Sequence, residues 1–362
     1  MNALNKLTAC LVLAVSFCLD GVHCQDFNTQ SVDNVENEAQ YAVFFTDKDN
    51  SPYSVNEPLE FLSQRALDRR EKRGIAVNED DLPVNPSYVD SLKNAGAYVK
   101  WTSRWANLAM IHASDEMIEE ISQMEMVDSV VYIKPSEMAV KNNVNPYNKW
   151  NEITYKPVEN NDACLLDYGF ARSQIMQVNG NALHEAGLTG EGVMIAVIDA
   201  GFKNVNEMQA FTHLYESGRI VYELDVVDID GDIYAYNVSD HGTSVLSTMG
   251  AYQPGLFIGT APDAEYALIR TEDSDTEYLV EEYNFLIGAE AADSIGADVV
   301  NTSLGYSTFD DPSMEQPYSD MDGNTAISSI AAKMMIERGV HFVTSAGNSN
   351  GSEWPWVGTP SD

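Results

Sequence analysis

The chain has 362 residues, of which 44% are hydrophobic, and this length and composition are typical of a globular protein with room for two domains. Its 56 acidic residues against 20 basic ones give a formal net charge of −36. Because such a balance repels phosphate groups, it argues against nucleic acid and anionic lipid surfaces as partners.

The first segment of the chain has the layout of a signal peptide. Lys6 precedes an apolar stretch over residues 7–19, and a polar break follows it. We therefore expect a signal peptide over residues 1–24 and secretion to the extracellular space or the periplasm. Three of the four cysteines lie in this segment, so the exported chain would keep Cys164 alone and have no disulfide framework. No other apolar stretch is long enough to span a membrane.

Residues 38–135 are predicted to form a small α+β domain. Apolar runs and helical stripes give the order strand, helix, helix, strand, strand, helix, strand. The first helical stripe begins at Leu59. The expected strands cover residues 41–45, 97–101, 108–111 and 130–133. This order predicts a ferredoxin-like domain that is long enough to fold alone.

A second domain is expected over residues 166–362, after an exposed linker at 136–165 that is rich in Asn, Glu, Lys and Pro. In this domain apolar strands alternate with helices, which predicts an α/β fold whose parallel sheet has helices on both faces. The strands are expected at 193–198, 264–269, 297–301 and 340–344, and the helices at 279–295 and 326–338.

Three polar side chains fall at the edges of these elements. Asp199 ends a buried strand, where open parallel sheets build their sites. His241 opens a predicted helix, where the small Gly242 is expected to leave room for a substrate, and Asn348 follows another strand in a turn of small residues. A carboxylate can hold a histidine in one tautomer, and an amide can donate to an oxyanion. Each polar residue alone is also compatible with an ordinary role, as a turn cap, a packing histidine or a turn asparagine.

Two further segments are candidates for binding. The segment Ser303, Leu304 and Gly305 follows a strand, and its backbone can pair with an extended peptide, although short turns of this kind are common. The acidic run with Asp228, Asp230 and Asp232 partly matches the spacing of a calcium loop. It lacks a closing bidentate Glu, so a solvated acidic loop is the alternative, and we expect no cofactor to be required.

Asp, His and Asn in this order resemble the subtilisin-like serine peptidases over residues 168–362. The segments 179–184, 320–323 and 354–362 are similar to those of secreted bacterial members. The resemblance implies an orienting acid at Asp199, a general base at His241 and an oxyanion donor at Asn348. It also implies that the N-terminal domain is a propeptide, which acts as an intramolecular chaperone and inhibitor.

The serine of the family's triad has no counterpart in this sequence. Its usual Gly-Thr-Ser setting occurs here only at residues 242–244, inside the His241 segment. Ser244 would share a helix face with His241 and cannot attack a carbonyl from the opposite side. We therefore interpret the chain as the precursor of a secreted serine endopeptidase acting on proteins or peptides. It is truncated before its nucleophile, and residues 1–362 are predicted to be inactive. The alternatives are a non-catalytic peptide-binding pseudoprotease and an inhibitor of other proteases that acts through its N-terminal domain.

Overall fold

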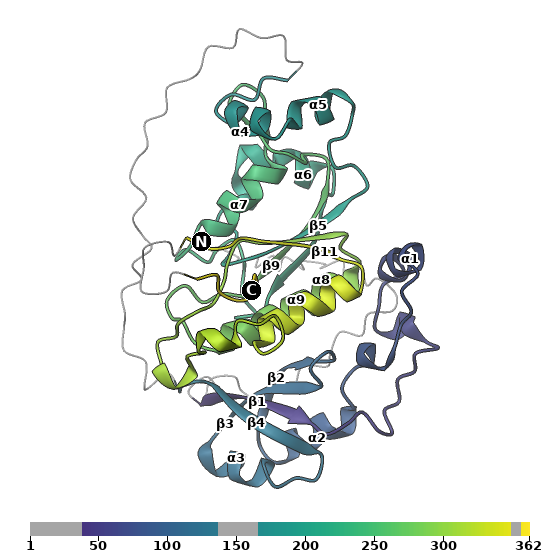
Figure 1. Cartoon of the computed structure of the whole chain (residues 1–362), viewed down its shortest axis with the longest axis vertical. Coiled ribbons are helices and arrows are strands. Elements are labelled where there is room, and N and C mark those ends of the chain that lie inside the picture. Colours follow the sequence, from purple (N-terminus) through teal and green to yellow (C-terminus); the bar gives the residue numbers. More distant parts are fainter. Residues whose placement is uncertain (1–37, 137–165, 349–355) are drawn as a thin grey trace, which may run out of the picture.

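The computed structural model describes residues 38–136, 166–348 and 356–362, which form two packed domains (Figure 1). The first domain, coloured purple to blue, lies against helices of the second domain, coloured teal to yellow. The predicted signal peptide, nearly all of the predicted linker and all the cysteines lie outside the described residues.

The first domain is a four-stranded antiparallel sheet in the order β2-β3-β1-β4. Helices α2 and α3 cover one of its faces, where Leu92 and Ile121 pack against Val43 and Ile111. Its elements are β1 (Ala39–Phe45), α1 (Gln64–Arg73), α2 (Pro86–Asn94), β2 (Tyr98–Ser103), β3 (Leu108–Ala113), α3 (Asp115–Ile121) and β4 (Val127–Lys134). The predicted element order and the ferredoxin-like sheet are confirmed.

The first predicted helix starts later than its apolar stripe suggests. Residues Pro58–Glu60 form a separate 3-10 turn, and Leu59 is 50% exposed. Helix α1 begins at Gln64 because Ser63 caps it, with the Ser63 Oγ accepting a hydrogen bond from the Ala66 N–H at 3.1 Å. The cap therefore outweighs the apolar pattern in setting the start of this helix.

The second domain is built on a five-stranded sheet in the order β11-β10-β5-β9-β6, and all of its strand pairs are parallel. The strands are β5 (Met194–Asp199), β6 (Ile220–Asp225), β9 (Glu265–Arg270), β10 (Val299–Thr302) and β11 (His341–Thr344). Four of them were predicted. Strand β6 was missed because it lies at the sheet edge and alternates exposed and half-buried residues, so it has no continuous apolar run.

Helices cover both faces of this sheet, as predicted. Along β5, Ala196 and Ile198 face a core shared with α8, and Val197 faces a second core that includes Leu246 of α7. The remaining elements are α4 (Arg172–Gln177), α5 (Gly180–Glu185), α6 (Thr212–Glu216), α7 (His241–Gly250), β7 (Tyr252–Gln253), β8 (Phe257–Ile258), α8 (Val280–Ile295) and α9 (Ile327–Glu337).

The two domains share one apolar core. Trp105, Leu108 and Met110 of the first domain belong to the same buried cluster as Phe285 of α8 and Met335 of α9. The second face of the N-terminal sheet is therefore buried on these two helices (Figure 1). Because this buried cluster is continuous across the two domains, the first domain is packed directly against the second domain.

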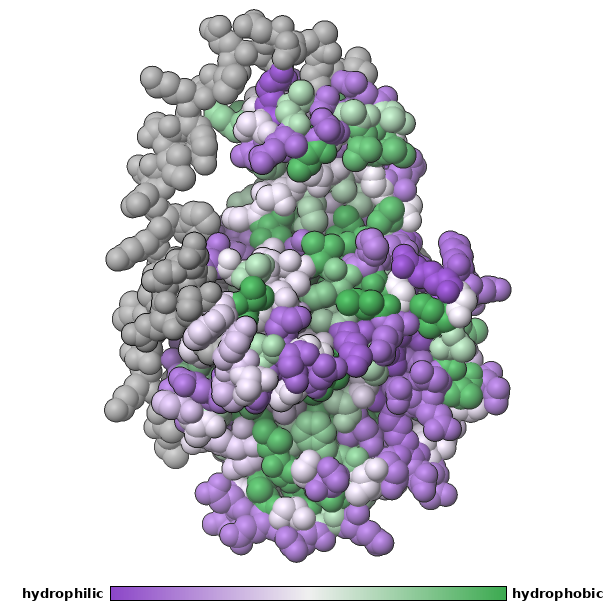
Figure 2. Space-filling view, viewed as in Figure 1, coloured by the Kyte–Doolittle hydropathy of each residue, from purple (hydrophilic) through white to green (hydrophobic). Residues whose placement is uncertain are grey.

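On the face that Figure 2 shows, hydrophilic and hydrophobic areas are interspersed, and a dense hydrophilic area lies around α1. In the three described ranges, no helix combines the length and the apolar character that a membrane crossing requires.

Candidate active site at the carboxyl edge of the parallel sheet

Asp199 is the last residue of the central strand β5, and its side chain is 1% exposed. Its Oδ1 accepts hydrogen bonds from the backbone N–H of Ala200 at 2.7 Å and from Nδ1 of His241 at 2.8 Å. Among the described residues, Oδ2 has no hydrogen-bond partner. The carboxylate is thus fixed by the strand that delivers it and is directed at one histidine.

His241 is the first residue of α7, and its backbone N–H donates to Oγ of Ser239 at 3.2 Å. Its ring pairs with Asp199 through Nδ1, while 43% of the side chain remains exposed. In the part of the chain that the structure describes, no hydrogen bond to Nε2 is present. The ring is therefore oriented on one side and open on the other, as a general base must be.

The negative charge of Asp199 also favours the protonated form of His241. The hydrogen bond to Asp199 raises the pKa of His241 above its ordinary value, and the charges of Asp199 and Asp240 act in the same direction, while burial opposes them. A raised pKa means that the imidazolium is stabilised once Nε2 has taken up a proton. The arrangement can therefore accept a proton from a hydroxyl and hold it close to Asp199.

Gly242 allows α7 to approach the end of β5 this closely. A Cβ at this position would come 2.4 Å from the carbonyl oxygen of Gly201 and 3.0 Å from Cβ of Asp199. Our sequence interpretation, that Gly242 leaves room for a substrate, is therefore wrong, because the space is filled by the protein's own backbone. Any side chain here would push His241 away from Asp199.

Asn348 lies at the same edge of the sheet, beyond β11, which is separated from β5 by β10. The chain enters this turn with the N–H of Ser345 donating to the carbonyl oxygen of Thr302 at 3.2 Å. Asn348 is exposed, and among the described residues no hydrogen bond links it to Asp199 or His241. The structure thus places Asn348 on the expected edge of the sheet, without a hydrogen bond to the pair among the described residues.

The segment from Ser303 to Gly305 follows β10, between β5 and β11. Within the described ranges, no backbone hydrogen bond involves these three residues. Immediately after them, Tyr306 and Thr359 exchange backbone hydrogen bonds of 2.8 and 3.1 Å. Among the described residues, the segment therefore presents backbone N–H and C=O groups without a backbone partner beside the site, and it is anchored at its far end.

In the described residues, the carboxylates of the acidic loop after β6 do not converge on one position. The side chains of Asp228, Asp230 and Asp232 are exposed, and no group of three or more acidic, His or Cys side chains in the described residues converges on a possible metal position. The neighbouring Asp225 is already occupied, because its Oδ2 binds Nη1 of Arg270 at 2.8 Å.

Sequence reasoning missed the residues that hold the loop leading to His241. Arg270, the strand partner of Asp199, forms the buried ion pair with Asp225 and lies 3.5 Å from the ring centroid of Tyr236. Tyr236 in turn accepts a hydrogen bond from the N–H of Ser274 at 2.8 Å. No local pattern marks these residues, which come from three separate segments.

A buried group of glutamates near the site was also missed. Glu272 follows β9, where its Oε1 accepts hydrogen bonds from Thr271 at 2.6 Å and from the Tyr306 hydroxyl at 2.8 Å. Burial raises the pKa of Glu272 to about 7 and that of Glu277 to about 8, and it raises that of Glu281 well above its ordinary value. In sequence, Glu281 resembles an ordinary acidic residue in the first turn of a helix.

Two family models match the chain, in the order that the two domains have. The Bacteroidota peptidase S8 propeptide domain matches residues 40–149, and the subtilase family matches residues 190–361. The two matched regions together cover more than half of the chain.

Curated relatives agree with these matches. The minor extracellular protease Vpr of Bacillus subtilis is 31% identical over 191 residues, and subtilisin E of the same species is 29% identical over 190 residues. These matches cover 51% and 49% of this chain but only 21% of Vpr and 40% of subtilisin E, so the chain spans less than half the length of each relative.

Solved structures that match the chain include fervidolysin of Fervidobacterium pennivorans, a keratinolytic enzyme related to subtilisin. Its TM-score is 0.49 at 18% identity, and the match covers 86% of this chain and 40% of that one. The family matches and the curated relatives, taken with the two-domain fold, show that the chain belongs to the subtilase family of subtilisin-like serine peptidases and carries an N-terminal S8 propeptide domain.

Proposed function

We propose that the protein is the precursor of a secreted serine endopeptidase that hydrolyses peptide bonds by acyl transfer. The observation that carries this proposal is the hydrogen-bonded pair of a buried Asp199 and a half-exposed His241 with an open Nε2. A protein that only binds peptides has no need for an oriented base, so the pair favours catalysis over the non-catalytic alternative.

In this proposal His241 removes the proton from a serine hydroxyl as that oxygen attacks the substrate carbonyl. Asp199 holds the ring in the tautomer that leaves Nε2 free and stabilises the imidazolium. His241 then returns the proton to the leaving amine. The acyl-enzyme that remains is hydrolysed by water through the same two residues.

The nucleophile is proposed to be a serine outside residues 1–362. Ser244, the candidate on α7, is exposed, and its backbone N–H donates to the carbonyl oxygen of Asp240 at 3.0 Å. No hydrogen bond joins Ser244 to His241 in the described part of the chain. Ser244 and His241 lie on the same helix, α7, so the argument made against Ser244 from the sequence also applies to the structure.

Substrate is proposed to lie along the segment from Ser303 to Gly305 as an added strand, because no backbone hydrogen bond to another described residue occupies these groups. Asn348 is proposed to donate its amide N–H to the oxyanion of the tetrahedral intermediate. Its position beyond β11 requires that the scissile carbonyl lie between this turn and His241. Both roles concern protein or peptide substrates, and no cofactor takes part.

The N-terminal domain is proposed to inhibit the peptidase domain until it is removed. Its shared core with α8 and α9 supports a stable complex between the two domains. Strand β4 ends at Lys134, whose Nζ lies 3.3 Å from Oδ2 of Asp273 in the peptidase domain. The last strand of the propeptide domain therefore ends beside the peptidase domain.

Peptide hydrolysis by the secreted, full-length protein tests the proposed function. We expect His241→Ala to lower kcat/KM by roughly 10⁴-fold or more. His341→Ala is the matched control, since His341 is exposed at the opposite end of the sheet, at the start of β11. Equal activities of the two variants would rule out the role given to His241.

A further inference from the structure

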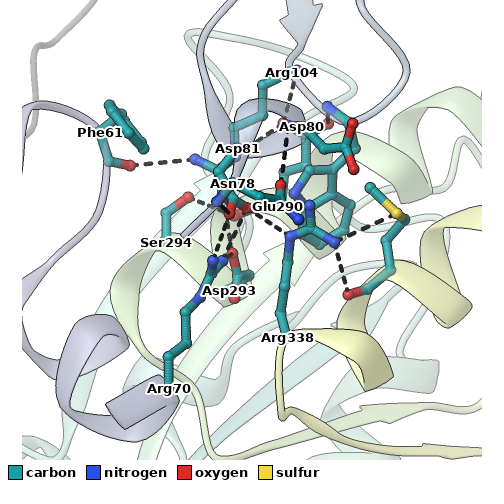
Figure 3. Close-up of polar contacts among 12 residues, drawn as sticks. Phe61, Arg70, Asn78, Asp80, Asp81, Arg104, Glu290, Asp293, Ser294 and Arg338 are labelled. Atoms are coloured by element: carbon teal, nitrogen blue, oxygen red, sulfur yellow. Dashed lines mark hydrogen bonds and ion pairs between the residues drawn. The ribbon is translucent and has the colours of Figure 1, made fainter. Parts of the chain in front are cut away.

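A buried cluster of ion pairs joins the two domains at Asp293, near the C-terminal end of α8 (Figure 3). Its Oδ2 binds Nη2 of Arg70 at 2.7 Å and Nη2 of Arg104 at 3.0 Å, and its Oδ1 binds Nη2 of Arg69. All three arginines belong to the propeptide domain. One peptidase carboxylate is thus held by three guanidinium groups of the other domain.

The cluster is reciprocal, because the propeptide domain also supplies a carboxylate to the peptidase domain. Asp81 binds Nε of Arg338, the residue after α9, at 2.7 Å, and it binds Nη1 of Arg70 at 2.8 Å. The guanidinium of Arg338 also lies 4.9 Å from the ring centroid of Trp105 in the propeptide domain. Each domain therefore contributes both a carboxylate and a guanidinium group to ion pairs across the interface.

Glu290 extends the cluster by one turn of α8. Its carboxylate accepts hydrogen bonds from the backbone N–H groups of Arg104 and Trp105 at 3.1 and 3.3 Å, and from the Ser103 hydroxyl. The peptidase domain therefore contacts the loop between β2 and β3 through the loop's backbone N–H groups as well as through the Arg104 side chain.

The burial of these ion pairs determines how they affect the binding of one domain to the other. The side chains of Arg69, Arg70, Asp81 and Asp293 are at most 3% exposed. A buried ion pair adds little net stability over an apolar pair, but removal of one partner leaves a buried charge without compensation. Such pairs therefore discriminate strongly between a matching surface and one that lacks a partner.

We propose that this cluster is the element by which the peptidase domain recognises its own propeptide domain. The recognised partner is a ferredoxin-like domain with guanidinium groups at positions 69, 70 and 104 and a carboxylate at position 81. The shared apolar core supplies contact area that a related propeptide can also offer, whereas the cluster rejects one that lacks these charges. The inference rests on the propeptide role proposed above but does not require peptidase activity.

A half-exposed set of ion pairs at the same interface provides the comparison. Arg65, also on α1, binds Glu265 at 2.7 Å and Asp298 at 2.8 Å, and all three side chains are 34% exposed. Exposed pairs are screened by water and salt and contribute little. Asp298→Asn is therefore a matched control for Asp293→Asn, since both substitutions neutralise an aspartate paired with an arginine of α1.

The experiment uses the whole chain with a site for a specific protease inserted in residues 137–165, so that the two domains can be separated after folding. After cleavage, dissociation of the two parts is followed by size-exclusion chromatography and by interferometry. We expect the wild-type parts to stay together. Asp293→Asn should weaken the complex by about 10²-fold or more, and Asp298→Asn by no more than about threefold.

Addition of Arg69→Met separates direct recognition from a general loss of packing. Because Arg69 contacts Asp293 directly, Arg69→Met should weaken the complex at least about tenfold less in the Asp293→Asn background than in the wild-type chain. These single and double substitutions form a double-mutant cycle, and thermal unfolding of each uncut variant checks that it folds. If Asp293→Asn does not fold, the same cycle is carried out with Glu290→Gln and Arg104→Met.

The possible outcomes are distinct. If the wild-type parts separate at once, the propeptide role itself is wrong. If they stay together but Asp293→Asn behaves like Asp298→Asn, or if the two substitutions of the cycle are additive, only the recognition proposal is overturned.

Discussion

The Asp199 site and the Asp293 cluster each centre on a buried aspartate, but they differ in how completely its partners enclose it. At Asp293 both carboxylate oxygens are bound by buried arginines of the other domain. At Asp199 one oxygen holds His241, whose ring is half open to solvent. The comparison teaches that a closed set of charges suits recognition, whereas catalysis needs a charge whose partner keeps one free face.

The largest effect that tests this comparison is expected at Asp199. Asp199→Asn should lower peptide hydrolysis by the full-length protein by about 10⁴-fold, because an amide no longer fixes the imidazole tautomer. The fold should be retained, since the amide is nearly isosteric with the carboxylate. Steady-state kinetics with circular dichroism measure both properties, and a loss below about tenfold would remove Asp199 from the proton-transfer machinery.

A smaller effect is expected at Asn348, which supports the reaction without taking a proton. Asn348→Ala should lower kcat by roughly 10²–10³-fold and leave KM nearly unchanged, because an oxyanion donor acts mainly in the transition state. Single-substrate kinetics separate the two parameters. A change confined to KM would assign Asn348 to substrate binding instead.

The close packing behind His241 is expected to be sensitive to a single methyl group. Gly242→Ala should lower the free energy of unfolding by about 1–3 kcal/mol and lengthen the Asp199–His241 hydrogen bond, because the added Cβ collides with the Gly201 carbonyl oxygen. Denaturant unfolding measures the loss of stability. Ser244→Ala on the exposed side of α7 is the control and should change neither stability nor hydrolysis.

The mildest effect concerns pH and the buried glutamates beside the site. Burial raises the pKa of Glu272 to about 7 and that of Glu277 to about 8 in the folded protein. Their contribution to stability is therefore fully present below the unfolded value of about 4.5 and is lost as pH rises through about 7 to 8. We therefore expect Tm to fall between about pH 4.5 and about pH 8 and to level off above that. Glu272→Gln should flatten the fall, and an unchanged slope would contradict the assignment.

The sequence is sufficient to predict most strands of the two main sheets, because most of them are continuous apolar runs, and it also identifies Asp199 and His241, whose side chains the structure brings together. Asp199 and His241 were identified because each stands at the end of an element whose boundaries are local. The role of Gly242 was misjudged because its neighbour, the Gly201 carbonyl, is brought near only by tertiary packing.

The interface cluster could not be predicted in the same way. Asp293 and Arg69 are separated by 224 residues, and neither breaks the pattern of its own helix. A helical Asp with apolar neighbours resembles a surface residue at the edge of a stripe. Only the docking of one domain on the other shows that its charge is buried and matched.

Covalent labelling with a fluorophosphonate probe tests the central claim, that His241 activates a serine, most directly. The full-length protein and residues 1–362 are treated in parallel, and the labelled serine is mapped by mass spectrometry. We predict a label at one serine outside residues 1–362, its loss in His241→Ala, and no label on residues 1–362 alone. A labelled serine within residues 1–362 that depends on His241 would contradict the proposed position of the nucleophile.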